Sequence, residues 1–65
     1  MKVRTGLALE LKIARITKGL TQYELSKIID EPTYNITRYE CGLAVPAPRA
    51  LAKIKKALGL DASVN

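Results

Sequence analysis

Four side chains able to donate hydrogen bonds occur at helical spacing in the segment PTYNITRYE, with no acid among them: Thr33, Tyr34, Thr37 and Arg38. If the segment is a helix, Ile36 and Tyr39 share its inner face and these four lie on the outer one. A surface rich in donors and poor in carboxylates has the chemistry to read base edges in the major groove of DNA. On a lone helix the same pattern is more often a solvated face. The elements predicted on either side of the segment are therefore needed to distinguish a DNA-reading face from a solvated one.

The net charge favours an anionic partner. The 65 residues include 11 Lys and Arg against 6 Asp and Glu, which gives a net charge of +5 and a pI near 9.7. Lys and Arg placed on phosphates release condensed counterions, so the charge raises nucleic acid as a partner. Taken alone the signal is weak, because many small basic domains bind protein or stay soluble by self-repulsion.

Other classes of protein are poorly supported by the composition. The chain has no histidine, no glycine-rich phosphate loop and no metal-ligand spacing, so we expect neither an enzyme nor a cofactor or metal. The single Cys41 cannot form an intrachain disulfide, which suggests a reducing compartment. No apolar run is long enough to span a bilayer, and we expect a soluble, cytoplasmic protein without a membrane partner.

The first predicted helix covers residues 5–18, with Thr5 as its cap and Gly19 as its stop. Its inward stripe is expected to contain Leu7, Leu11, Ala14 and residues 16–18, beginning with Ile16. Leu9 and Ile13 lie four residues apart on another face, where they would form a protein contact or only scattered exposed side chains.

The second predicted helix begins at a strongly marked cap. Thr21 and Glu24 have the spacing of a capping box, and Leu25, Ile28 and Ile29 are expected inward, with Ser26 allowing close helix approach. Residues 30–32 interrupt the pattern, and we expect Pro32 to open the third helix after a cap at Asp30 or Glu31. Two short helices meeting at such a break are typical of a helix-turn-helix.

After Cys41, Gly42 closes the third helix, and the segment LAVPAP is expected to be an extended connection. A fourth helix is predicted over residues 48–58, with Gly59 ending it and Leu60 folding back onto the core. Its inward residues would be Leu51, Ile54, Ala57 and Leu58, beside a basic flank of Lys53, Lys55 and Lys56. The expected fold is a single all-α domain, a compact bundle of four or five short helices, with a flexible basic arm (1–4), a folded core (5–60) and a tail (61–65).

A series of residues across the chain forms one combined pattern: Gly19, Leu20, Thr21, Gln22, Glu24, Leu25, Ser26, Ile36, Thr37, Arg38, Tyr39, Glu40, Gly42, Pro46, Leu51, Ile54, Ala57, Leu58 and Gly59. This pattern resembles the Cro and Xre-like helix-turn-helix regulators, which include the lambdoid phage repressors. The resemblance covers residues 7–60 without a gap, and as a combined string it is highly specific. It implies a lambda-repressor-like DNA-binding domain of phage or prokaryotic type.

The resemblance also implies roles for individual residues. Gln22 would bind a DNA phosphate together with backbone N–H groups at the helix start, and Asn35 would reach another phosphate. Thr33, Tyr34 and Arg38 would enter the major groove with Thr37 beside them, where Arg38 could grip a guanine. An ion pair between Arg15 and Glu40 would hold the recognition helix on its scaffold.

The chain departs from the family pattern in two places. Asp30, Glu31 and Pro32 replace the usual glycine, apolar residue and small hydroxyl of the turn, and two carboxylates beside DNA would repel it unless the turn directs them away. A fifth helix, through which many members of the family dimerise, is missing, which leaves a homodimer on a palindromic operator open.

Two functions from different classes follow. The first is a sequence-specific DNA-binding transcriptional regulator, a repressor, that reads double-stranded DNA with the third helix. The alternative is a protein-interaction module of the same fold, such as an antitoxin or a phage anti-repressor component. Its contact surface would be Leu9 and Ile13, or residues 43–45 with Leu43 and Val45.

Overall fold

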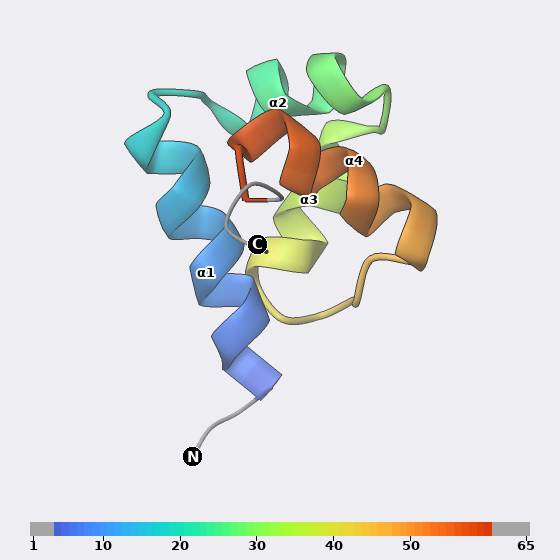
Figure 1. Cartoon of the computed structure of the whole chain (residues 1–65). Coiled ribbons are helices and arrows are strands. Elements are labelled where there is room, and N and C mark those ends of the chain that lie inside the picture. The colour runs from blue at the N-terminus through green and yellow to red at the C-terminus, as the bar shows by residue number, and fades with distance from the viewer. Residues whose placement is uncertain (1–3, 61–65) are drawn as a thin grey trace.

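The computed structural model describes residues 4–60, and within that range it contains four helices and no strand: α1 (Arg4–Thr17), α2 (Gln22–Ile29), α3 (Thr33–Glu40) and α4 (Pro48–Leu58). α1 is the longest and runs along one side of the molecule, with the three shorter helices gathered beside it (Figure 1). α3 packs against α1 and α2, and α4 packs against α2. The all-α fold expected from the sequence is therefore confirmed. Of the expected arm (1–4), Arg4 belongs to α1, and residues 1–3 lie outside the described residues, as does the expected tail (61–65).

An aliphatic cluster forms the core and draws on every helix: Leu11, Leu25, Ile29, Ile36, Ile54 and Leu58. Tyr39, Ala57 and Leu60 pack around it, as the spacing predicted. The predicted burial of Ile16 and Ile28 is wrong, because they are 55% and 57% exposed, and residues 17 and 18 of the expected inward stripe are exposed as well. Each lies near the C-terminal end of its helix, where the periodic pattern assigns several apolar residues inward and the neighbouring helix covers only some of them.

Helix α1 begins one residue earlier than expected, so Thr5 lies inside the helix and is not its cap. The capping box of α2 is confirmed: the Thr21 hydroxyl accepts from the Glu24 N–H, and the Glu24 carboxylate accepts from the Thr21 N–H, at 3.0 and 2.8 Å. Both bonds satisfy amides that the first helical turn leaves without a partner.

The three-residue turn between α2 and α3 differs from its prediction. Asp30 is the C-cap of α2 with a left-handed backbone (φ 58°, ψ 48°), and Pro32 is the N-cap of α3 with extended dihedral angles. Pro32 thus precedes the helix and does not occupy its first position, and neither Asp30 nor Glu31 caps α3. The fixed φ of proline suits an extended cap residue as well as a helical one, so sequence alone could not separate the two.

Candidate nucleic-acid interface

The outer face of α3 presents a stacked pair of side chains. Tyr34 is 70% exposed, and the guanidinium carbon of Arg38 lies 5.5 Å from the centre of its ring. The two residues are four positions apart, one helical turn, which brings their side chains together. Stacking on an aromatic ring holds the guanidinium in place through a cation–π contact while leaving its N–H groups free to donate.

The other two predicted base-reading residues face α2. The Thr33 hydroxyl lies 3.0 Å from the Ser26 hydroxyl, and the Ser26 hydroxyl donates to the carbonyl oxygen of Tyr23 at 2.6 Å. The Thr37 hydroxyl donates to Gln22 Oε1 at 2.8 Å. Both threonines are half-buried, and they join the two helices of the helix-turn-helix.

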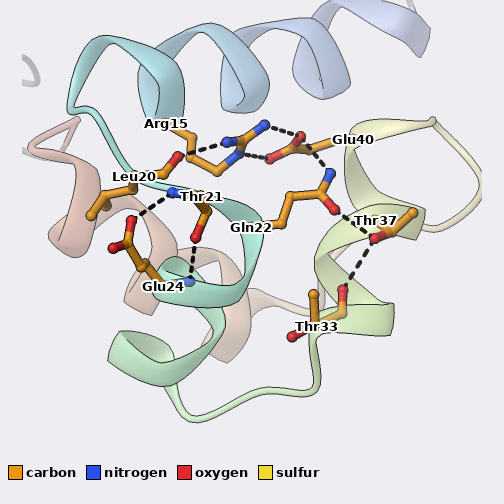
Figure 2. Close-up of polar contacts among 8 residues, drawn as sticks. All are labelled: Arg15, Leu20, Thr21, Gln22, Glu24, Thr33, Thr37 and Glu40. Carbon is orange, nitrogen blue, oxygen red and sulfur yellow. Dashed lines mark hydrogen bonds and ion pairs between the residues drawn. The ribbon is translucent and has the colours of Figure 1, made fainter.

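Arg15 and Glu40 form an ion pair between α1 and the end of α3 (Figure 2). Arg15 Nε and Nη2 donate to the two carboxylate oxygens at 2.6 and 3.0 Å, and Nη1 donates to the Leu20 carbonyl oxygen at 2.6 Å. The side chains are only 10% and 3% exposed. The hydrogen bonds to Glu40 raise the pKa of the Arg15 guanidinium, and the attraction of the carboxylate adds to this rise while burial opposes it.

Gln22 connects this ion pair to Thr37 on α3 (Figure 2). Its Nε2 donates to Glu40 Oε1 at 3.1 Å, and its Oε1 accepts from Thr37. Because a carboxylate only accepts, the amide must turn its nitrogen to Glu40 and its oxygen to Thr37. Sequence reasoning assigned Gln22 to a phosphate and missed this link, since no local pattern joins positions 18 and 15 residues apart.

The carboxylate of Glu31 turns inward. Its Oε1 accepts from Asn35 Nδ2 at 3.0 Å and lies 3.5 Å from the Tyr39 hydroxyl, while Oε2 lies 3.7 Å from Lys53 Nζ on α4. Burial raises the pKa of the Tyr39 phenol, and the charge of Glu31 and its hydrogen bond add to this rise. The positive charge of Arg38 lowers the pKa and so opposes part of it. Of the two turn carboxylates, only that of Asp30 is left exposed.

Comparison with known protein families assigns the chain to a family of helix-turn-helix domains. The helix-turn-helix family model matches residues 11–64, and the chain therefore belongs to the Cro and Xre-like helix-turn-helix family. This is a class of DNA-binding domains that act in transcription regulation, which agrees with the packing of α3 on α2 and α1.

The chain is also similar to individual proteins of known name. The chain is similar to multiprotein-bridging factor 1c of Arabidopsis thaliana, with 39% identity over 91% of this chain and 40% of that protein. It is equally similar to multiprotein-bridging factor 1 of Candida albicans, with 39% identity over 91% of this chain and 39% of that protein. The endothelial differentiation-related factor 1 homolog of Danio rerio is 46% identical over 71% of this chain and 32% of that protein.

The chain thus spans two fifths or less of the length of these relatives. They come from a plant, a yeast and a fish, so the phage or prokaryotic type implied by the resemblance is not confirmed. None of the helices within residues 4–60 is long and apolar enough to cross a membrane.

Proposed function

We propose that this domain is a non-catalytic, sequence-specific DNA-binding module that lays α3 in the major groove. One observation carries the proposal: the domain itself uses most of the polar side chains of α3. Thr33, Asn35, Thr37, Tyr39 and Glu40 all hydrogen-bond within the domain. Within residues 4–60, the side chains of Tyr34 and Arg38 contact each other and form no hydrogen bond.

Arg38 and Tyr34 are therefore the proposed base-reading pair. A guanidinium can donate two hydrogen bonds to the O6 and N7 acceptors of a guanine, and a tyrosine ring can contact a thymine methyl group beside it. Thr33 and Thr37, placed between α2 and α3, would set the angle of the helix and border the contacted bases.

Gln22 retains a role toward phosphate in this proposal. Its amide nitrogen has two hydrogens, of which Glu40 takes one, so the second can reach a phosphate oxygen beside the N-terminus of α2. Asn35 gives one amide hydrogen to Glu31 in the same way, and its phosphate contact would use the other.

A binding-site selection read by sequencing tests the proposal. We expect the full chain to enrich one motif, and Arg38→Ala to lose the preference for one base pair by a factor corresponding to about 1–3 kcal/mol. Lys56→Ala, which removes an equal charge from α4, is the matched control and should weaken binding without changing the motif. Enrichment of no motif, or the same motif for Arg38→Ala, would contradict the proposal.

The same selection addresses the homodimer. Two inverted half-sites with centres about 34 Å apart would indicate two domains on one face of the duplex. Repression, the outcome that the resemblance implied, would follow where the bound domain covers a promoter. A reporter with the selected site overlapping the promoter, compared with one carrying the site upstream, separates repression from activation.

A second candidate function is protein bridging. The relatives are named multiprotein-bridging factors, and α1 exposes a stripe of three apolar side chains at helical spacing: Leu9, Ile13 and Ile16 at 57%, 54% and 55%. Exposed apolar side chains gathered on one helix face mark contact surfaces. We propose that this α1 stripe contacts protein while α3 contacts DNA.

A pull-down tests the second function: the protein is immobilised, and the proteins that bind to it are recovered and identified. Leu9→Ser with Ile13→Ser should lose a stoichiometric partner and retain DNA binding. Leu43→Ser with Val45→Ser alters residues that are 73% and 80% exposed in the α3–α4 connection, the other expected contact. If only the Leu43→Ser, Val45→Ser variant loses the partner, the contact surface is the α3–α4 connection and not the α1 stripe.

A further inference from the structure

We propose that a second surface, on α2 and α4, docks an acidic amphipathic helix of a protein partner. The surface is a hollow of about 270 Å³, called the α2–α4 groove here and lined by Ile28, Ile29, Lys53, Lys56 and Ala57. The two helices that form it pack against each other. The inference does not depend on DNA reading by α3.

The floor and one wall of the groove are apolar. Ile29 is a core residue with 2% exposure and forms the floor, and Ala57 lines the hollow as well. Ile28 forms a wall and is 57% exposed, although the sequence pattern predicted it inward. An apolar side chain inserted between Ile28 and Ala57 would remove this surface from water, which is favourable.

Lysines provide the remaining wall. Lys53 and Lys56 are three residues apart on α4, so their side chains emerge on the same face of the helix. Lysine lays its methylene groups along apolar surface and holds its ammonium group at the rim. Lys53 lies 3.7 Å from Glu31 but remains 41% exposed, and Lys56 forms no ion pair within residues 4–60.

An apolar floor beside two positive charges fits one chemistry of partner. Carboxylates three or four residues apart on a helix have the spacing of the two lysines, and apolar residues on the adjoining face would enter the groove. The net charge of +5 attracts an acidic helix and repels a basic one. Nucleic acid fits less well, because its phosphates have no use for the apolar floor.

The groove and the reading pair lie on different elements. The groove is lined from α2 and α4, whereas Tyr34 and Arg38 lie on α3. We therefore expect a helix in the groove to leave the donors of α3 uncovered, so that the domain holds DNA and an acidic helix at the same time.

The test is a nuclear magnetic resonance titration of the full chain with two synthetic helical peptides. Both peptides carry leucines at helical spacing, and one has glutamates where the other has lysines. We expect the glutamate peptide to shift the amide signals of Ile28, Ile29, Lys53, Lys56 and Ala57. It should bind about tenfold more tightly than the lysine peptide, because two rim charges contribute.

Paired variants locate the contact. Ile28→Ser should weaken binding of the glutamate peptide roughly tenfold through loss of apolar burial. Tyr23→Ser, a change at another exposed side chain of α2 (60%), should not. Lys56→Glu should weaken binding, whereas Lys12→Glu on α1 should change it much less. These four positions are exposed, so the fold should survive each change.

Three results would overturn the proposal. One is a titration in which the groove amides do not shift. Another is equal affinity for the two peptides, which would show that charge does not select the partner. The third is movement of the groove amides when residues 61–65 are removed without any peptide, which would identify the chain's own tail as the occupant.

Discussion

At the scale of single residues, Glu40 is the centre of the polar network. Its carboxylate accepts two hydrogen bonds from Arg15 and one from Gln22, and its side chain is 3% exposed. A carboxylate shielded from water is costly to bury unless such donors hydrogen-bond it. Glu40 therefore links α1, α2 and α3 at one point.

Removing one partner of this ion pair is expected to cost more than removing both. Arg15→Met alone leaves the Glu40 carboxylate buried with a single donor, and we expect the free energy of unfolding to fall by about 3 kcal/mol. The double variant Arg15→Met, Glu40→Leu removes both charges and should lose less. Urea denaturation followed by circular dichroism measures both, and additive losses would show that the two side chains are not coupled.

Tyr39 gives the fold a dependence on alkaline pH. Burial and Glu31 raise the pKa of its phenol in the folded state above the unfolded value, which is about 10. The neutral phenol thus stabilises the fold fully below pH 10, and this stabilisation is lost as pH rises through the folded pKa.

The Tyr39→Phe variant is expected to lose less stability between pH 9 and 11 than the natural chain. Thermal unfolding at a series of pH values measures this slope. Tyr23→Phe, which removes the hydroxyl of a tyrosine that is 60% exposed, is the control. Parallel curves for Tyr39→Phe and the natural chain would refute the account.

At the scale of elements, the end of α2 is strained for its residue type. Asp30 adopts φ 58°, a conformation that costs most side chains energy but not glycine. Its carboxylate also stands at the negative end of the helix dipole. Both effects act against the turn that positions α3.

Asp30→Gly is therefore expected to stabilise the domain, by roughly 0.5–1 kcal/mol. Gly42→Ala is a control of opposite sign, because Gly42 has φ 76° with open space around an added Cβ, so that only backbone strain is introduced. Melting temperatures measure both changes. A lower melting temperature for Asp30→Gly would show that the aspartate contributes more than its backbone costs.

At the scale of the whole molecule, the core is small and wholly aliphatic. Six buried side chains from four helices form its centre, in a chain of 65 residues. A domain of this size has a free energy of unfolding of roughly 3–10 kcal/mol. Single core changes are therefore comparable with the whole stability of the fold.

Ile54→Ala illustrates this limit. Ile54 is 1% exposed and packs among the other core side chains, so its truncation should cost about 2–5 kcal/mol through lost burial and an unfilled cavity. Ile16→Ala, at an exposed position, should change stability by less than about 0.5 kcal/mol. A small loss in the free energy of unfolding of Ile54→Ala, measured by urea denaturation, would mean that the core repacks to fill the cavity.

The sequence by itself determined the features that depend on neighbours a few residues apart. The capping box of Thr21 and Glu24, the left-handed Gly42 and Gly59, and the bounds of α4 all follow from local hydrogen bonding and backbone sterics. The core residues Leu25, Ile36 and Ile54 follow from helical periodicity.

Only the tertiary structure decided which side of each helix meets another element. The exposure of Ile16 and Ile28, the inward turn of Glu31, and the link from Glu40 through Gln22 to Thr37 depend on partners distant in the chain. The sequence shows which side chains of α3 can donate hydrogen bonds. Which of these donors remain free at the surface depends on the packing of α1 and α2, because a hydrogen that is bonded inside the domain is no longer offered outside it.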